Sequence, residues 1–458
     1  MPVIAVFDVG KTNKKLFLFD ENYKIVFEKS ARFIETVDED GFPCENVESL
    51  RLSVFDSLSE VFRLKEFQVK AVNFSTYGAS FVYVDETGKP VCPLYNYLKP
   101  YSEELSREFY TKYGGEEQFS LSTASPVLGS LNSGLQVYRI KKERPDIFSQ
   151  VKYALHLPQY MSFLLTGQPY ADLTSIGCHT GMWDFEKNRY HEWIQREGIT
   201  MKLPPLAPAN KVSQALFPGN KYKVGVGLHD SSAALIPYLI NFSEPFVLIS
   251  TGTWCISLNP FNQQPLTVEE LKNDCLSYLQ YQGRPVKASR LFAGMEHEQQ
   301  VKRIAEHFNK NIIKFRNVVF DVGLVARLNN KKANFAADAS LNKKSRFAER
   351  EISGFKDEIE AYHQLMMDII ELQIESVQLV LKGVRVIRIF VDGGFSKNSV
   401  YMHLLAMAFP RIEIFAASMA QASAVGAALV IHKEWNRKPV PTDIINLTYY
   451  SANQTLAL

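Results

Sequence analysis

The sequence has few cysteines, and none of them stands in a spacing that binds zinc or builds a disulfide framework. Its 458 residues include only five, which are far apart and odd in number: Cys44, Cys92, Cys178, Cys255 and Cys275. This usage favours a reducing compartment, and we expect a cytoplasmic protein. The N-terminal apolar run has no basic residue before it and is broken at Asp8, so we expect no signal peptide.

The sequence also lacks a charge imbalance and a clear membrane span. Its 51 Lys and Arg face 49 Asp and Glu, a formal net charge of +2, which gives no electrostatic reason to expect nucleic acid or an acidic membrane as a partner. The longest apolar stretch, residues 414–431, approaches the roughly 20 residues that a bilayer span needs. It is rich in Ala and contains Ser418, Gln421 and Ser423. We therefore interpret it as a short strand followed by a buried helix.

Several common motifs for phosphate and hydrolytic chemistry are missing. There is no G-x-x-x-x-G-K-[ST] loop, no G-x-G-x-x-G fingerprint, no G-x-S-x-G elbow and no H-E-x-x-H pair. His191-Glu192 and His297-Glu298 lack the second His of a zinc motif. Any phosphate chemistry must therefore use another scaffold.

What the sequence does contain is a crude internal duplication. Residues 3–8 and 16–19 are apolar strands joined by a short polar turn, and residues 246–250 and 254–258 repeat this pattern. A chain of this length exceeds the roughly 250–300 residues at which one core stops growing. We therefore expect two related α/β lobes.

Four segments carry polar residues where strands end. Asp8 ends the first strand beside the Gly10 turn and could hold a hydrated Mg²⁺, although an ordinary hairpin explains the same pattern. Asp230 lies where a helix starts, so it is either an N-cap or a catalytic base. Residues 250–254 (STGTW) and 390–398 (FVDGGFSKN) place glycines at strand ends, where a backbone can approach a phosphate.

These four segments, in this order, resemble the FGGY family of carbohydrate kinases, within the actin/hexokinase-like superfamily. The resemblance covers essentially the whole chain. It implies an α/β fold of two ribonuclease-H-like (actin-like ATPase) domains with a catalytic cleft between them. Residues 1–240 would be the N-terminal lobe with the sugar site, the first phosphate turn and the catalytic Asp. Residues 241–458 would be the C-terminal, nucleotide-binding lobe.

The resemblance also implies roles for individual residues. Asp230 matches the base that deprotonates the sugar hydroxyl, and Asp8 matches the residue that organises Mg²⁺. The residues implied for ATP binding are Asp8, Gly10, Lys11, Thr12, Asn13, Lys15, Thr251, Gly252, Thr253, Gly393, Gly394 and Asn398. The strands around residues 75–82 resemble the sugar-contacting hairpin of the family, which implies substrate contacts for Tyr77, Gly78, Ala79, His229 and Asp230.

The first turn departs from the family pattern, which usually reads Asp-x-Gly-Thr-Thr-Ser followed by a cation, often Arg. Here Lys11 replaces the first Thr, Asn13 replaces Ser, and Lys15 stands at the Arg position. Lys is a point charge and cannot make the bidentate phosphate contacts of Arg. We expect phosphoryl transfer to be retained with different contacts.

The sequence thus predicts an ATP- and Mg²⁺-dependent kinase for a small sugar, with a ketose such as L-rhamnulose or L-fuculose as the favoured acceptor. A pentulose or polyol acceptor stays open, as do an actin- or chaperone-like ATPase and a sugar-binding regulator. ATP and the sugar are the expected partners, with no nucleic acid and no membrane. The sequence leaves the oligomeric state open, including a homodimer.

Overall fold

The computed structural model describes residues 1–11, 14–30, 35–217, 221–330, 345–419 and 421–451. The chain forms two compact units. Unit 1 consists of residues 1–241, 277–285 and 421–444, and unit 2 consists of residues 242–276, 286–420 and 445–458. The chain therefore crosses between the units more than once.

The sheet of unit 1 is built around the apolar strand β1 (Pro2–Val9), whose Val, Ile and Phe side chains are buried. β1 pairs antiparallel with β2 and parallel with β6. The strand order is β13-β14-β6-β1-β2-β3, and β15 also pairs with β6. The other strands are β2 (Lys14–Phe19), β3 (Ile25–Ser30), β6 (Gln68–Thr76), β13 (Val212–Gln214), β14 (Lys223–Gly225) and β15 (Leu228–His229).

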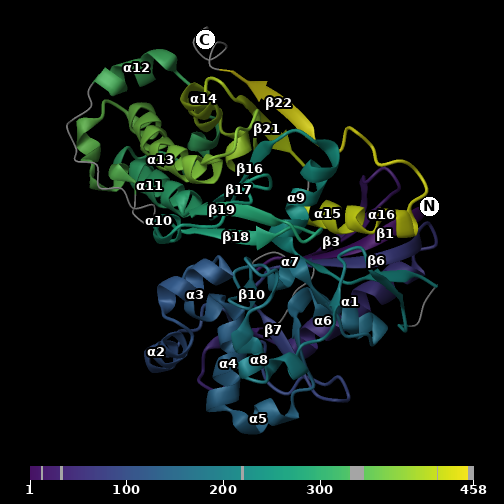
Figure 1. Ribbon diagram of the computed structural model, residues 1–458. Coiled ribbons are helices and arrows are strands. Elements are labelled where there is room, and N and C mark those ends of the chain that lie inside the picture. The colour runs from purple at the N-terminus through teal and green to yellow at the C-terminus, as the bar shows by residue number, and fades with distance from the viewer. Residues whose placement is uncertain (12–13, 31–34, 218–220, 331–344, 420, 452–458) are drawn as a thin grey trace. The chain divides into compact units, whose positions relative to one another are not determined.

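Helices and short strand pairs complete unit 1, and Figure 1 labels most of them. The helices are α1 (Val47–Arg63), α2 (Glu103–Lys112), α3 (Glu116–Thr123), α4 (Ser133–Glu143), α5 (Pro145–Gln150), α6 (Leu157–Thr166), α7 (Leu173–Ile176), α8 (Glu192–Arg196), α9 (Asp230–Asn241), α15 (Ala422–Val430) and α16 (His432–Trp435). The short strands are β4 (Glu35–Val37), β5 (Pro43–Glu45), β7 (Phe81–Val84), β8 (Tyr153–His156), β9 (Ala171–Asp172), β10 (Trp183–Asp184), β11 (Arg189–Tyr190) and β12 (Leu206–Ala207).

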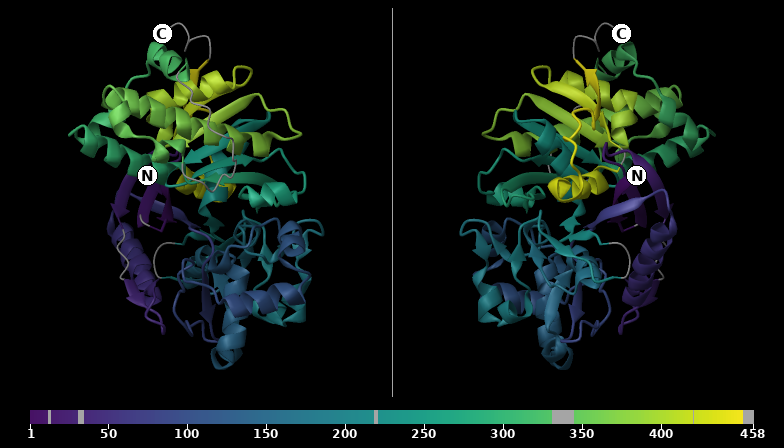
Figure 2. Two further views of the ribbon diagram at one scale, coloured as in Figure 1. Left: turned by 90° about the vertical axis from the view of Figure 1, so that its left-hand side faces the viewer. Right: turned by 90° about the vertical axis from the view of Figure 1, so that its right-hand side faces the viewer.

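The helical character predicted for residues 101–170 is confirmed by α2 to α6. Figure 2 shows these blue helices grouped together in unit 1. They pack on an aromatic core in which the Phe109 ring lies 5.0 Å from Tyr138 and 5.1 Å from Trp193, centroid to centroid. This satellite core lies apart from the one under the sheet, which includes Phe7 and Phe74.

The sheet of unit 2 repeats the pairing of unit 1. β16 (Phe246–Thr251) pairs antiparallel with β17 (Cys255–Asn259) and parallel with β20 (Arg388–Gly393). The strand order is β18-β19-β17-β16-β20-β21-β22, with β18 (Cys275–Leu279), β19 (Pro285–Leu291), β21 (Glu413–Ser418) and β22 (Asn446–Tyr450). The predicted duplication and α/β class are confirmed.

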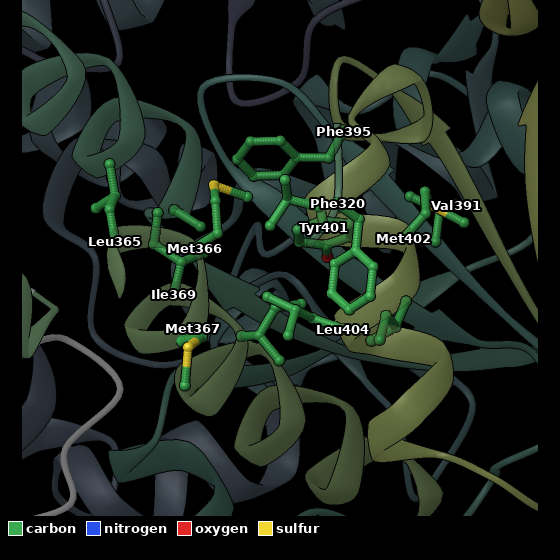
Figure 3. Close-up of a cluster of buried hydrophobic side chains, with 14 of the residues drawn as sticks. Phe320, Leu365, Met366, Met367, Ile369, Val391, Phe395, Tyr401, Met402 and Leu404 are labelled. Carbon is green, nitrogen blue, oxygen red and sulfur yellow. The ribbon is translucent and has the colours of Figure 1, made fainter. Parts of the chain in front are cut away.

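Helices α10 (Val268–Lys272), α11 (Ala293–His307), α12 (Val322–Asn330), α13 (Glu358–Leu381) and α14 (Ser399–Ala408) belong to unit 2. Asp357 starts α13, because its Oδ1 accepts hydrogen bonds from the Ile359 and Glu360 amides. The helix then buries Leu365, Met366 and Ile369 against Tyr401, Met402 and Val391, as Figure 3 shows. Short 3₁₀ turns occur at Gly129–Leu131, Ile199–Lys202, Ile312–Asn317, Arg346–Glu349, Ile352–Gly354 and Phe395–Lys397.

The interpretation of residues 414–431 is confirmed, because β21 is followed by α15, most of which is buried. Across the described part of the chain, every helix falls short of the length and apolarity that a membrane span requires. The predicted hairpin at residues 75–82 is wrong. β6 and β7 both form, but β7 pairs with β8 instead of β6, because the chain turns out of the first sheet at Tyr77.

Candidate active site

Three parallel strands of unit 1 end side by side and bring the predicted residues together. Asp8 of β1 is in register with Ser75 of β6, and His229 of β15 is in register with Thr76. Asp230 follows His229 directly as the first residue of α9. The carboxyl edge of the sheet therefore gathers both carboxylates that the sequence singled out.

Asp230 is a partly exposed carboxylate that its immediate neighbours hold in place. Its Oδ1 accepts a hydrogen bond from the Ser231 amide at 2.6 Å, and His229 Nε2 lies 3.2 Å from the same oxygen. The side chain keeps 32% of its surface exposed. The surrounding protein nevertheless removes enough hydration to raise the pKa of Asp230 to about 6. At neutral pH it is an ionised carboxylate of increased basicity.

Asp8 is held by a residue far along the chain. Ser423 of α15 donates its hydroxyl to Asp8 Oδ1 at 2.9 Å. Burial raises the pKa of Asp8 to about 6, and the negative charge of Asp230 adds to the shift. Two carboxylates that repel each other in this way are a donor set that a hydrated Mg²⁺ fits, since this ion needs only one or two carboxylates. No group of three or more His, Cys, Asp and Glu side chains suited to a metal occurs among the described residues.

The turn that follows β6 forms the wall beside Asp230. The Tyr77 amide donates to Val9 O at 2.9 Å. Ala79 adopts a left-handed conformation (φ 58°), and its carbonyl accepts from Gln136 Nε2 at 2.8 Å. A Cβ at Gly78 would lie 3.0 Å from both Cys178 Sγ and a carbon of the His229 ring. Gly78 therefore allows this wall to approach His229 closely.

Burial keeps His229 neutral, because it lowers the pKa of the imidazole to about 3. Its Nε2 also lies 3.1 Å from Cys178 Sγ, and its backbone amide donates to Thr174 Oγ1 at 3.0 Å. Several contacts fix the ring. Because the ring is neutral, it can orient the Asp230 carboxylate without forming an ion pair with it.

Aromatic and cationic side chains lie beside this wall. The Tyr77 and Tyr97 rings pack edge to face at 5.9 Å, and Lys11 Nζ lies 5.2 Å and 5.4 Å from their centroids. Lys11 and Lys14 also lie 3.6 Å and 3.1 Å from the buried Glu45 carboxylate. Lys15 pairs with Glu28. Thr12 and Asn13, predicted for the same turn, lie outside the described residues.

Unit 2 contains a cavity of about 730 Å³ lined by four of the predicted residues, Thr251, Gly252, Gly394 and Asn398. Thr251 Oγ1 accepts from the Phe395 amide at 3.0 Å and donates to Asp392 O. The two strand ends meet so closely that a Cβ at Gly393 would lie 1.9 Å from Thr251 O. Gly393 (φ 88°) is therefore required for the shape of the cavity, although it does not line it. Thr253 is also outside the lining.

Several other polar and apolar residues that line this cavity were not predicted from the sequence. Asn398 caps α14 through the Tyr401 amide and donates its side-chain amide to Tyr362 OH at 2.7 Å. Tyr362 OH lies 3.2 Å from His297 Nε2, and burial lowers the pKa of His297 to about 4. Val301, Ile312 and Phe315 supply an apolar wall, and Lys302, Arg316 and Lys397 supply cations.

Most of the residues that sequence reasoning missed come from distant segments. Ser423 reaches Asp8 across 415 positions of the chain, and Cys178 reaches His229 across 51. Gly294 is required because a Cβ there would lie 1.8 Å from Gly252 O. None of these has a local signal, whereas His297 stands in a His-Glu pair that by itself indicates only half of a zinc motif.

Models of known protein families match both the N-terminal and the C-terminal part of the chain. The N-terminal domain of the FGGY family of carbohydrate kinases matches residues 3–236, and the C-terminal domain of FGGY carbohydrate kinases matches residues 243–439. A rhamnulokinase of Halalkalibacterium halodurans is 27% identical over 278 residues, 54% of each chain. A rhamnulokinase of Klebsiella pneumoniae is 25% identical over 243 residues, 50% of this chain and 48% of that protein. The chain thus spans about half the length of the curated relatives it matches.

Solved structures share the fold over nearly the whole chain. A carbohydrate kinase of Novosphingobium aromaticivorans has a TM-score of 0.79 at 21% identity, covering 98% of this chain and 94% of that one. A xylulose kinase of Lactobacillus acidophilus has the same TM-score at 16% identity, covering 100% and 95%. Because the two domain matches together span nearly all of the sequence, this chain belongs to the FGGY family of carbohydrate kinases.

Proposed function

We propose that this protein transfers the γ-phosphoryl group of ATP to a hydroxyl group of a small ketose, with Asp230 as the general base. The observation that carries the proposal is the Asp230 carboxylate. It is partly exposed, more basic than an ordinary Asp, and fixed beside a neutral His and the close-packed Gly78 wall. A base in such surroundings can accept the proton of an attacking hydroxyl at neutral pH.

ATP is assigned to the cavity of unit 2. Val301, Ile312 and Phe315 offer an apolar surface for a base, and Gly252 and Gly394, which follow β16 and β20, have no side chain to keep a phosphate from the backbone. A volume of about 730 Å³ suits a ligand of nucleotide size.

Asp8 would hold Mg²⁺, which when bound neutralises charge on the transferring phosphate. Ser423 orients the Asp8 carboxylate for that role. Asp8→Ala should fold, because Ser423 can turn to solvent, yet it should lose most of its Mg²⁺-dependent turnover. Near wild-type rates for this variant at low Mg²⁺ would remove Asp8 from the site.

We further propose a deoxyketohexose of the rhamnulose or fuculose type as acceptor. The rhamnulokinase relatives support this choice, as does Tyr77, whose ring beside Gly78 could cover an apolar sugar face. Phe81, four residues after Tyr77, is a second aromatic residue that could make this contact. Its ring belongs to the satellite core, with its centroid 3.8 Å from that of His156, whereas Tyr77 lies on the turn beside Gly78. Tyr77 is therefore the favoured aromatic candidate.

The test is ADP release with a matched panel of L-rhamnulose, L-fuculose, D-xylulose, L-ribulose, D-fructose, glycerol and erythritol. A methyl group in an apolar pocket is worth about 1–3 kcal/mol, so we expect kcat/KM for the deoxyketoses to exceed that for the pentuloses about tenfold or more. A higher kcat/KM for D-xylulose than for the deoxyketoses would instead favour a pentulose acceptor, as the names of the xylulose kinases that share the fold suggest. ATP hydrolysis insensitive to every sugar would favour the actin- or chaperone-like ATPase.

A further inference from the structure

Unit 1 contains a second cavity, which we call the basic pocket, of about 700 Å³. It opens at the amino ends of the parallel strands, where Pro2 of β1, Gln68 of β6 and Lys223 of β14 line it. The candidate active site lies at the carboxyl ends of the same strands. Since β6 has nine residues, the two edges are roughly 26 Å apart at the 3.3 Å rise of a strand residue.

The basic pocket concentrates positive charge in a chain that is nearly neutral. Five cations line it against two carboxylates, Glu21 and Glu434. The cations are Lys70, Lys221, Lys223, Lys433 and Arg437. This excess of three positive charges exceeds the net charge of +2 of the entire chain.

Most of these cations have no acidic partner among the residues that the structure describes. Lys223 pairs with Glu434 at 2.5 Å, and Glu21 pairs with Lys438 at 3.3 Å. Both carboxylates are therefore already engaged. Within the described ranges, the other four cations of the basic pocket make no ion pair. Like charges gathered in a concave site attract an anion.

Both walls of the basic pocket lead to the candidate active site. β14 carries Lys223 and continues to Asp230 seven residues later, with the Gly227 amide held by Asn73 Oδ1 at 3.1 Å. The other wall is α16, which continues from α15, the helix whose Ser423 holds Asp8. Asn73 also donates to Ala427 O at 2.7 Å and so ties α15 to β6. A shift of either wall would be felt at a catalytic carboxylate.

We propose that the basic pocket binds a small phosphate ester, such as a phosphorylated sugar, and that this ligand changes the rate of the reaction at Asp230. Phosphate oxygens would accept hydrogen bonds from the unpaired cations. Gln214 donates its side-chain amide to Tyr222 O, and its side-chain oxygen could accept from a hydroxyl group of the ester. The concave shape and volume suit a small molecule better than the extended backbone of a nucleic acid.

Binding is tested by calorimetry on the full chain with D-glucose 6-phosphate as probe, in saturating Mg·ADP so that the unit 2 cavity is filled. The double variant Lys221→Ala/Lys433→Ala removes two unpaired cations. We expect its Kd to rise about tenfold or more. The matched control Lys89→Ala/Lys152→Ala removes two exposed lysines beside the β7–β8 pair and should bind like wild type.

Equal affinity of the two double variants, equal binding of unphosphorylated glucose, or stronger binding of a single-stranded oligonucleotide would each overturn the ligand assignment. Coupling is tested by initial rates with the best acceptor. The probe should change the wild-type rate about twofold or more and leave the pocket variant unaffected, and an unchanged wild-type rate would overturn the coupling. The rate assay depends on the proposed kinase function, but calorimetry does not, so the failure of one can be told from that of the other.

Discussion

The contacts of Asp230 with other described residues are made through Oδ1, to which the Ser231 amide and the His229 ring are both close. The role of a base and the role of a helix-starting residue are therefore separable, because an amide side chain can still accept through its oxygen. Asp230→Asn should remain folded, with a thermal unfolding midpoint close to wild type. Its kcat should fall about 10²–10⁴-fold, the usual contribution of a general base.

Calorimetry on the same variant measures its affinities for ATP and sugar. These affinities decide whether a loss of rate reflects a lost base or lost binding. Retained binding of ATP and sugar with lost turnover supports the base. A variant that unfolds readily but keeps its specific activity when folded would leave Asp230 as a purely structural residue.

The raised pKa of Asp230 predicts an acid limb in the pH profile. The base acts only when ionised, and its pKa in the folded protein is about 6. We therefore expect kcat/KM for the acceptor to fall about tenfold per pH unit below about pH 6 and to level off above about pH 7. Asp8 also has a pKa of about 6, but bound Mg²⁺ should lower it. Profiles at low and saturating Mg²⁺ separate the two, since only a limb that belongs to Asp8 should move with the metal.

Gly78 makes a prediction about acceptor binding. A methyl group there would approach Cys178 Sγ and the His229 ring to 3.0 Å, so the ring must move away from residue 78 by a few tenths of an ångström, which changes its position beside Asp230. Gly78→Ala should raise KM for the sugar about tenfold, because small displacements of positioning groups cost much, while KM for ATP stays unchanged. Gly354→Ala is the control, since its added methyl meets open space. Equal effects on both KM values would place Gly78 outside the acceptor site.

At the scale of the element, local patterns predicted strands and helices well and pairings poorly. β1, β2, β16 and β17 were predicted because apolar runs and short polar turns are local features. The predicted pairing of β7 with β6 is wrong, because the actual partner, β8, lies some 70 residues further along the chain. The same limit applies to the site. Asp8 lies one residue before the end of β1 and Asp230 directly follows β15, so local patterns could mark both, whereas Ser423 and Cys178 reach the site only through tertiary packing.

The packing of α15 on α9 tests whether this helix supports the site. A Cβ at Gly426 would lie 1.9 Å from the Ala233 carbonyl oxygen, and a backbone atom cannot rotate away as a side chain can. Figure 1 shows the two helices side by side. Gly426→Ala should therefore destabilise the protein by about 1–3 kcal/mol, although Ala favours a helix over Gly. Because α15 also carries Ser423, which holds Asp8, the kcat of the Gly426→Ala variant should fall as well.

Chemical denaturation and initial rates measure both effects of Gly426→Ala, with Gly354→Ala as the matched control, expected within about 0.5 kcal/mol of wild type. A stabilised Gly426→Ala protein would mean that α15 moves away from α9 without loss, and that the close approach of the two helices is not required.

At the scale of the whole molecule, our proposal assigns different parts of the reaction to the two units. The residues assigned to the acceptor and its base lie in unit 1, and the cavity assigned to ATP lies in unit 2. Each ligand should therefore stabilise mainly the unit that binds it, because binding to the native state is linked to its stability. Hydrogen exchange resolves such effects along the chain.

We expect Mg·ADP to slow amide exchange at residues 251–252 and 394–398, and the acceptor to slow it at residues 76–79 and 229–231. The backbone bonds from Tyr77 to Val9 and from Gly394 to Thr251 are the ones each ligand should protect. Asp230→Asn serves as control, because it should keep both protection patterns while losing turnover. If ADP protected only the unit 1 segments, or the sugar only the unit 2 segments, the two ligand assignments would have to be exchanged, while Asp230 would still be tested independently by its kinetics.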